Sequence, residues 1–440
     1  MKISGWGRFP LEHCKIARPR SPDAVARQIA RGPVIARGNG RAYGDSALNR
    51  EGTLDMRGFN RISAFDAASG QIVAEAGVLL SDIIASFLPR GWFPSVTPGT
   101  KFVTIGGMIA ADVHGKNHHK HGSFGRFIDW IDVMGADGAI TRCGPDQNPD
   151  LFDWTVGGMG LTGVILRAAF RLQPVESGWI EQTTLPAGNL EAAMAIFEAA
   201  QDATYSVAWI DCLASGAALG RSLVMLGEHA SAGDLPMKLR RRPFETPRKG
   251  TRRVPFNAPG FALNRHSVRA FNALYYYTGA RKAGTQLVDW DSYFYPLDAI
   301  LDWNRIYGRD GFAQFQCALP LETSKSGLTA LLTRLSAAGQ GSFLAVLKRF
   351  GAQDSRFSFP MEGYTLALDF PVRPKTLSLL SELDQITLAH GGRFYLAKDS
   401  RMTSDTLRAS DNRVQSFLDM RDQTGVSTQF TSSQSERLKL

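Results

Sequence analysis

The chain has 440 residues, of which 44% are hydrophobic and 21% are charged, the balance of a globular protein in water. This length suits two domains rather than one core. No run of apolar residues is long enough to span a membrane, the first residues lack the apolar segment of a secretory signal, and the four cysteines form no CxxC pair. We therefore expect a two-domain cytoplasmic protein without a disulfide framework.

The first 176 residues alternate short strands and helices with glycine-rich turns, which indicates one α/β unit. The triplet Ser21-Pro22-Asp23 supplies the capping residue, first-turn proline and first-turn acid of a helix that ends at Gly32. A short strand at 34–36 and a second helix at 79–88 follow.

Three glycine clusters lie in this unit, and each can turn backbone N–H groups toward a phosphate, since glycine adopts positive φ angles without strain. The first, 38–45, follows a strand directly, and the second joins Pro98-Gly99-Thr100 to the paired glycines of 103–110. Both patterns also fit tight turns or close backbone packing. The third, 157–163, contains a formal GxGxxG, but residues 164–172 have the period of a strand rather than a helix, which disfavours a Rossmann site.

Residues 112–122 contain four of the eight histidines of the chain. A metal site is one interpretation, but Lys116 and Lys120 would repel a cation, and Asp112 is the one acid among them. A cationic wall for phosphate or for a reduced, anionic cofactor fits the charges better. We predict no metal site.

A change of pattern at 174–178 predicts the boundary to a second domain. Beyond it we expect helices at 190–200, 324–338 and 376–390, and strands at 206–212, 314–318, 343–348 and 364–370. This order predicts an antiparallel sheet with helices on one face, and the chain as a whole is predicted to be α+β.

A basic stretch runs from Lys238 to Arg253 within the loop 230–256, and Glu245 is the one acid between these two residues. Its cations are Lys238, Arg240, Arg241, Arg242, Arg248, Lys249, Arg252 and Arg253. With its prolines, the stretch predicts a mobile, solvated loop. The alternative is a surface for a phosphate or anionic lipid headgroups, which would associate the protein with the inner face of the membrane. No nucleic acid is expected, because no aromatic residues are interleaved for stacking.

In their order along the chain, these motifs resemble the vanillyl-alcohol-oxidase-type (PCMH-type) family of FAD-binding oxidoreductases. More narrowly, the chain resembles the oxidases of two-enzyme epimerases that act on polyprenylphosphoryl-ribose. The similarity spans nearly the whole chain: it rests on the glycine clusters, on the run from His114 to His119, and on Trp303-Asn304-Arg305, Gln314-Phe315-Gln316, 343–350, Asp369-Phe370-Pro371 and Lys398-Asp399-Ser400-Arg401.

The resemblance implies a two-lobed FAD-binding domain made of residues 1–176 and 392–440, and a substrate domain at 177–391. It also implies non-covalent FAD, because Arg41 stands where many relatives attach the flavin to a histidine. The implied cofactor-binding residues are Gly38, Asn39, Gly40, Arg41, Ala42, Tyr43, Pro98, Gly99, Thr100, Thr104, Gly106, Gly107, Ala110, His114, Gly115, Lys116, Asn117, His118 and Gly163.

The resemblance further implies that Lys398, Tyr43 and Gln316 are catalytic and that Gln314, Gln316, Lys348 and Lys398 bind substrate. Lys398 would stabilise negative charge on the flavin as hydride arrives. From the sequence alone, a surface lysine beside Asp399 is the commoner role. The implied activity is oxidation of a sugar secondary alcohol by hydride transfer to flavin N5. The expected substrate is the 2′-hydroxyl of polyprenylphosphoryl-β-D-ribose, and a partner short-chain reductase would reduce the 2′-keto product to an arabinose.

Two alternatives stay open: a soluble alditol or sugar-lactone oxidase of the same family acting on a free sugar, and a flavin-bound scaffold for a partner reductase. The departures from the family bear on the substrate. Tyr364-Thr365-Leu366-Ala367 stands where relatives often have Trp-Asn-Ile-Cys, and Phe294 replaces a tyrosine. The flavin site is untouched by these changes.

Overall fold

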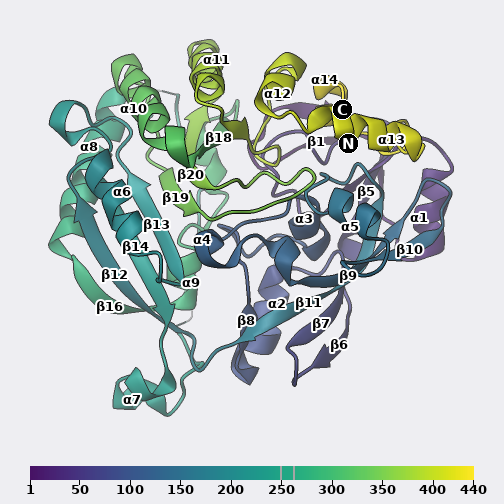
Figure 1. Cartoon of the computed structure of the whole chain (residues 1–440), viewed down its shortest axis with the longest axis horizontal. Coiled ribbons are helices and arrows are strands. Elements are labelled where there is room, and N and C mark those ends of the chain that lie inside the picture. Colours follow the sequence, from purple (N-terminus) through teal and green to yellow (C-terminus); the bar gives the residue numbers. More distant parts are fainter. Residues whose placement is uncertain (248–249, 261–262) are drawn as a thin grey trace.

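The computed structural model describes residues 1–247, 250–260 and 263–440. Two antiparallel sheets organise these residues, with helices along the outside (Figure 1). The first has the order β10-β9-β11-β7-β6, with β8 paired to the end of β11, and the second has the order β16-β12-β14-β13-β19-β20-β18-β21. The mixture of helices with antiparallel sheets confirms the predicted α+β class.

The predicted N-terminal elements form close to their expected positions. Helix α1 (Pro22–Ile29) is capped by Ser21, whose hydroxyl accepts a hydrogen bond from the backbone N–H of Ala24 at 3.3 Å. Strand β4 (Ile35–Arg37) pairs in parallel with β5 (Thr53–Asp55), which also pairs with β3 (Ile16–Ala17). A small hairpin of β1 (Lys2–Ser4) and β2 (Leu11–His13) precedes them.

The first sheet is built around its longest strand, β11. Its members are β6 (Ile62–Asp66), β7 (Gln71–Glu75), β8 (Trp92–Pro94), β9 (Ile128–Met134), β10 (Ile140–Cys143) and β11 (Val164–Pro174). In β11, Arg167 and Arg171 are exposed between buried residues, as the strand period predicts. Because the third glycine cluster leads directly into this strand, the GxGxxG is not a Rossmann motif.

Helices α2 (Leu80–Phe87), α3 (Ile105–Ala110), α4 (His118–His121) and α5 (Pro149–Thr155) accompany this sheet. Helix α3 contains the second glycine cluster and is capped by the hydroxyl of Thr104. A Cβ added to Gly106 would lie 2.9 Å from the Cβ of Ala76, so this glycine lets the helix pack closely against the chain after β7.

The second sheet is fully antiparallel. Its strands are β12 (Trp179–Ala187), β13 (Tyr205–Ile210), β14 (Ser222–His229), β16 (Gly284–Asp289), β18 (Phe312–Pro320), β19 (Ala345–Phe350), β20 (Gly363–Pro371) and β21 (Arg393–Phe394). Helices α6 (Leu190–Ala199), α10 (Leu321–Ala338) and α11 (Pro374–Ala389) cover one face. On β19 and β20, Leu347 and Leu366 belong to that core, so the alternating neighbours Lys348 and Thr365 point to the opposite face.

Helix α8 (Arg265–Arg281) departs from the expectation of helices on one face. Its Tyr275 ring lies 4.7 Å from that of Trp209, and the side chain of Leu223 fills the space beside Gly279. Trp209 and Leu223 alternate with Ala208 and Val224, which face α6. Tyr275 and Gly279 of α8 therefore pack on the face opposite to α6, whereas Val268 near the start of α8 belongs to the core that α6, α10 and α11 cover.

The basic stretch contains the short helix α7 (Met237–Arg240) and strand β15 (Arg252–Arg253), which pairs in parallel with β17 (Ile300–Leu301). Arg248 and Lys249 lie outside the described residues. Helix α7 stands away from the body of the molecule at the lower edge of Figure 1. By contrast, the chain after β15 runs beside the 3-10 helix η6 (Trp303–Tyr307), since Arg305 donates to the carbonyl of Pro255 at 2.9 Å.

The C-terminal segment, with α12 (Ser404–Ser410), α13 (Val414–Gln423) and α14 (Ser433–Leu438), returns to the N-terminal part. Arg437 on α14 donates to Asp45 at 2.7 Å and to Asp399 at 2.9 Å. From these contacts we propose that residues 392–440 form one domain with residues 1–176. None of the helices in the described ranges combines the length and apolar character needed to cross a membrane.

Candidate active site

The N-terminal and C-terminal segments of the chain meet where Tyr43 lies beside Lys398. The backbone N–H of Tyr43 donates to the carbonyl of Ala397 at 2.9 Å. This bond places the Lys398 ammonium 3.6 Å from the centroid of the Tyr43 ring, a cation–π contact. The Tyr43 ring in turn packs edge-on against Phe312 at the start of β18. A lysine that sequence alone would assign to the surface is therefore half-buried where the N-terminal and C-terminal segments meet strand β18, a place that we call the junction.

The second sheet presents polar side chains to this junction. Gln314 on β18 donates to the carboxylate of Asp369 on the neighbouring strand β20. Gln316 lies 3.3 Å from the hydroxyl of Thr365 and 3.2 Å from the Nε2 atom of His114. Strand periodicity places both glutamines on one face, because they are two residues apart. The predicted substrate residues Gln314, Gln316 and Lys348 are thus brought onto the same face of the sheet as Asp369.

Half-buried lysines dominate the charge of the junction. Burial lowers the pKa of Lys348 to about 8. Burial and the neighbouring Lys348 lower the pKa of Lys398, whereas Asp369 opposes this shift. Burial likewise raises the pKa of Asp369, although Gln314 and Lys398 stabilise its charged form. The junction holds cations that lack full solvation, an environment that favours an anionic ligand.

His114 belongs to this polar group, but as a neutral ring. Burial, together with the positive charges of Lys348 and Lys398, lowers its pKa well below the usual value. The ring lies among Phe350, Tyr395 and Phe359, with centroids 4.8 Å, 5.1 Å and 5.7 Å away. Its buried Nδ1 atom has no hydrogen-bond partner within the described part of the chain.

The neighbours of His114 mainly hold their own loop in place. Lys116 donates to the carbonyl of Tyr293 and lies 3.9 Å from the centroid of that ring. Asn117 donates to the carbonyl of Ser95 at 2.8 Å, and His118 lies 2.8 Å from the side-chain oxygen of Gln353. Across residues 1–247, 250–260 and 263–440, no group of three or more His, Cys, Asp or Glu side chains could hold a metal ion.

The first two glycine clusters lie together. A Cβ on Gly38 would be 2.1 Å from the Thr104 hydroxyl, and the side chain of Asn39 donates to the carbonyl of Phe102 at 2.8 Å. Gly99, by contrast, faces open space. Arg41 lies over the ring of Trp6 at 4.0 Å, and its buried Nε atom has no partner among the described residues.

The remaining predicted cofactor residues differ in their surroundings. A Cβ on Gly107 would approach only the Thr104 hydroxyl within 4 Å, whereas one on Gly115 would be 2.5 Å from the Asn117 side chain. The Thr100 hydroxyl donates to Asp298 at 2.8 Å. A Cβ on Gly163 would be 2.5 Å from the side chain of Val133 on β9. The backbone oxygens of Ala42 and Ala110 accept hydrogen bonds from Trp6 and Met159.

Asp369 and Thr365 are the functional candidates that sequence reasoning left without a role. Asp369 lies in the motif Asp369-Phe370-Pro371, two residues from Ala367 and four from Thr365 along β20. This spacing puts all three side chains on the face that carries Gln316. Strand periodicity from Gln316 and its antiparallel partner could have identified them.

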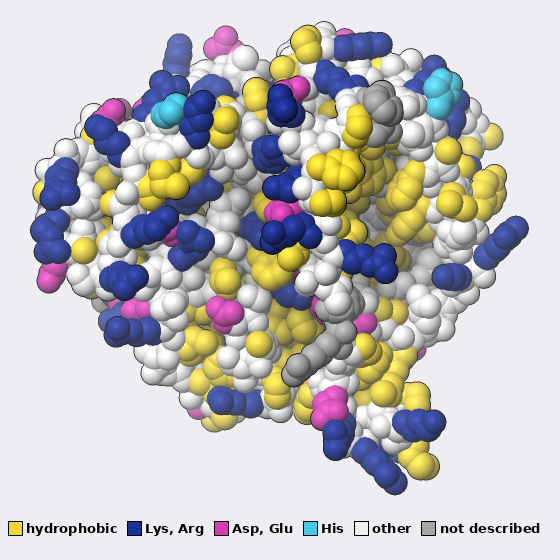
Figure 2. Space-filling view, turned by 180° about the vertical axis from the view of Figure 1, so that it is seen from behind, with side chains coloured by type: hydrophobic (Ala, Val, Ile, Leu, Met, Phe, Trp, Pro, Cys, Tyr) yellow, Lys and Arg dark blue, Asp and Glu magenta, His cyan; other side chains and the backbone are white. Residues whose placement is uncertain are grey.

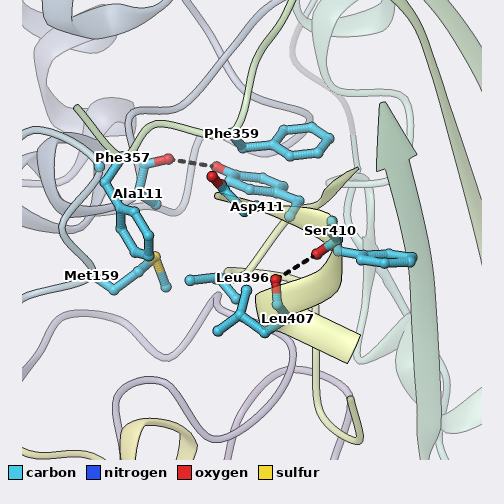
Figure 3. A pocket seen from close by; sticks show the side chains of 11 residues that line it. Ala111, Met159, Phe357, Phe359, Leu396, Leu407, Ser410 and Asp411 are labelled. Atoms are coloured by element: carbon cyan, nitrogen blue, oxygen red, sulfur yellow. Dashed lines mark hydrogen bonds between the residues drawn. The ribbon is translucent and has the colours of Figure 1, made fainter. Parts of the chain in front are cut away.

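A separate pocket is lined by Met159, Leu396 and Asp411 among others (Figure 3), and its polar side chains already have partners. The Tyr395 hydroxyl donates to the carbonyl of Ala111 and the Ser410 hydroxyl to that of Leu407, both at 2.9 Å. Asp411 pairs with Arg413 at 2.6 Å. Without free donors for a sugar or phosphate, this pocket is a poorer candidate than the junction at Lys398. Its lining is Ala111, Gly157, Met159, Phe357, Phe359, Phe394, Tyr395, Leu396, Leu407, Ser410 and Asp411.

Comparison with known proteins gives the junction a chemical context. The family described as FAD binding domain matches residues 15–144. Decaprenylphosphoryl-beta-D-ribose oxidase of Mycolicibacterium smegmatis is 35% identical over an alignment 457 positions long, gaps included. This alignment covers all of this chain and 97% of the relative. L-Gulonolactone oxidase of Mus musculus is 29% identical over 34% of each chain. Cytokinin dehydrogenase 5 of Arabidopsis thaliana is 27% identical over 39% of this chain and 34% of its own.

The residues at the junction fit FAD. Gly99 leaves backbone free of neighbours where a pyrophosphate could approach, and the buried Nε atom of Arg41 has no partner among the described residues. The unpartnered Nδ1 of His114 and the cationic Lys398 would face the isoalloxazine ring. When bound, FAD accepts a hydride from a substrate carbon.

We predict that the purified protein is yellow and releases its flavin on acid precipitation, because an arginine at position 41 cannot form the histidyl–flavin bond. Absorbance of the supernatant and of the washed pellet measures the outcome. Flavin that stays in the denatured pellet would contradict non-covalent binding, and the variant Arg41→His offers a comparison.

Proposed function

The chain belongs to the FAD-dependent oxidoreductase family of decaprenylphosphoryl-beta-D-ribose oxidase, and on this basis we propose that it oxidises the 2′-hydroxyl of a polyprenylphosphoryl-β-D-ribose to the 2′-keto sugar. The observation that carries the proposal is that the similarity to decaprenylphosphoryl-beta-D-ribose oxidase extends over the whole chain. It includes the second sheet with Gln314, Gln316 and Lys348, whereas the lactone oxidase matches about a third of the chain. A free-sugar oxidase is therefore the weaker candidate.

In the proposed reaction, the substrate carbon gives a hydride to flavin N5 while its hydroxyl loses a proton. Lys398, fixed over Tyr43, would stabilise the negative charge that develops next to it. Gln314 and Gln316 would hold the sugar hydroxyls, because their amides lie at the same face. Lys348 would bind the phosphate, since a half-buried ammonium attracts an anion more strongly than an exposed one.

An anaerobic titration tests this function. The holoenzyme is mixed with polyprenylphosphoryl-ribose, with free ribose and alditols, and with L-gulonolactone, and the flavin absorbance is followed. Bleaching by the lipid-linked ribose, with a 2′-keto product by mass spectrometry, supports the proposal. Bleaching by free alditol or lactone alone would assign the chain to the other branch, and no bleaching by any sugar would favour a scaffold role.

Replacing Lys398 with alanine is expected to slow flavin reduction by about 10²-fold or more, since a preorganised charge near the developing anion is lost. FAD content should stay unchanged. Rapid-mixing absorbance measures the rate. Lys325→Ala provides the control, because that lysine forms an exposed pair with Glu191 on the helical face. A near-native rate in the Lys398 variant would remove this residue from the mechanism.

The charge of Lys348 predicts a pH dependence of substrate affinity. The pKa of this lysine is lowered to about 8, so its positive charge is present below that pH and is lost as the pH rises through it. A phosphodiester keeps its negative charge throughout, so KM for the lipid-linked substrate should rise above pH 8. Lys348→Gln should raise KM at neutral pH and flatten the rise.

Lys348→Arg is the matched variant for this test, because a guanidinium stays charged through the same range. It should keep KM low at high pH. If all three proteins share one profile, Lys348 does not contact the phosphate.

We further propose that a separate short-chain reductase takes up the 2′-keto product.

We also propose that the basic stretch contacts an anionic membrane surface. The support for this contact is the exposure of the described cations on or next to α7 and on β15. Replacing Arg240, Arg241, Arg242, Arg252 and Arg253 with glutamine should strongly weaken binding to anionic vesicles, at about 1 kcal/mol for each cation. Co-sedimentation at low and high salt measures this binding.

The two halves of the basic stretch are separable in this experiment. Variants limited to Arg240, Arg241 and Arg242 affect α7, and those limited to Arg252 and Arg253 affect the chain beside η6. Lys15→Gln with Arg50→Gln is the control for total charge, since both are exposed elsewhere. Binding that is absent in the parent, or equal in all variants, would leave the stretch as solvated loop.

A further inference from the structure

One short segment in the second half of the chain supports both of the first two glycine clusters. It comprises residues 298–304, which contain β17 and the start of η6 and connect β16 with β18 of the second sheet along the sequence. We call it the bridging segment. Its contacts with the N-terminal part of the chain are made at its two ends.

At the first end, Asp298 binds the second glycine cluster. Its carboxylate accepts hydrogen bonds from the hydroxyl of Thr100 and from the backbone N–H of Lys101, both at 2.8 Å. Acidic side chains commonly stand in water, as those on the face in Figure 2 do, whereas Asp298 is 7% exposed. A buried carboxylate that receives two donors from one loop fixes the conformation of that loop.

The same loop has a further tie to the chain before the bridging segment. The Lys101 ammonium donates to the carboxylate of Asp291 on helix α9 (Trp290–Phe294) and lies 5.2 Å from the centroid of the Trp290 ring. Directly before these tied residues comes Gly99, where an added Cβ would meet nothing within 4 Å. The loop is therefore held next to an open stretch of backbone that a phosphate group can approach.

At the other end of the bridging segment, Asn304 supports the first glycine cluster through Trp6. The Asn304 amide donates to the carbonyl of Trp6 at 2.9 Å, and the Trp303 ring packs edge-on against the Trp6 ring at 5.7 Å. Trp6 in turn donates its backbone N–H to the carbonyl of Ala42 at 2.8 Å, and its ring lies 4.0 Å from the Arg41 guanidinium.

The two glycine clusters also meet electrostatically at Arg41 and Asp298. Burial lowers the pKa of Arg41, and the charge of Asp298 opposes this shift. Burial raises the pKa of Asp298, whereas the hydrogen bonds from Lys101 and Thr100 and the charges of Lys101 and Arg41 lower it. Charges influence each other in this way only at short range. The bridging segment thus acts on both clusters at one place.

We propose that Asp298 and Asn304 are positioning residues of the FAD site, which hold the two glycine clusters in the arrangement that receives the pyrophosphate. Each acts through a residue of the N-terminal part, Thr100 or Trp6, and needs no contact with the cofactor itself. A loop that is ordered in advance loses less conformational entropy on binding, so its ligand leaves more slowly. This role goes beyond the proposed function, because it is independent of which sugar is oxidised.

Release of FAD from the holoenzyme tests this role without turnover. The holoenzyme is diluted at a temperature below its unfolding transition, and the fluorescence of free flavin gives the release rate. Asp298→Asn keeps the size of the side chain but offers one acceptor to two donors, so release should be about tenfold faster. Asn304→Ala should act in the same direction. Asp302→Asn is the matched control, because Asp302 pairs with the exposed Arg253 at 3.3 Å, and its release rate should equal that of the parent.

A second pair of variants approaches the same contact from the loop. Thr100→Val removes the hydroxyl that Asp298 accepts from and should speed FAD release, whereas Thr100→Ser keeps a hydroxyl and should restore the parent rate. The double variant Asp298→Asn, Thr100→Val should release FAD little faster than the faster single variant, because both changes remove one shared contact. If Asp298→Asn does not fold, the comparison of valine with serine at position 100 decides the question.

Three results would overturn the proposal. The first is a parent-like release rate in both Asp298→Asn and Thr100→Val. The second is release that coincides with loss of the circular dichroism signal, which would make these residues supports of overall stability alone. The third is a double variant whose effects simply multiply. Failure to oxidise any sugar would contradict the proposed function and leave this role standing, since the readout is the bound cofactor.

Discussion

The ion pairs of Arg437 are the interaction on which the junction depends. Its guanidinium holds Asp45, two residues after Tyr43, and Asp399, the residue after Lys398. Two carboxylates buried side by side would repel each other without this cation, and removing one partner of such a group is costly. The arginine thereby fixes the register between the N-terminal and C-terminal segments. The cation–π contact of Lys398 with Tyr43 follows from that register.

The second sheet adds a different constraint, since each of its strands has to serve two environments. Leu347 and Leu366 fill the core under the helices, and their neighbours Lys348 and Thr365 face the junction. A slip of one residue would bury the lysine and expose the leucines. The apolar core therefore fixes which polar groups meet the ligand. This coupling explains how side chains from β18, β19 and β20 converge without being adjacent in sequence.

Local patterns predicted much of the fold. Strand and helix periods placed β18, β20, α10 and α11 within a few residues, because each has one apolar face. They missed α8, whose inward face rests on aromatic rings and the buried amide of Asn272 rather than on an aliphatic stripe. The meeting of Lys398 with Tyr43 could not be read from periodicity, since it depends on a long-range ion pair. Family resemblance supplied that part of the site.

The position of Arg437 also bears on the order of events during biosynthesis. Asp45 emerges early from the ribosome, whereas the cation that neutralises it is made hundreds of residues later. Domains generally fold as units while the chain is being made. Until Arg437 has been made, the carboxylate of Asp45 in the N-terminal lobe lacks this ion-pair partner. Contacts between residues so far apart in sequence also form slowly. The junction can therefore be completed only after Arg437 has been made, and a cofactor that requires both segments would bind only after that step.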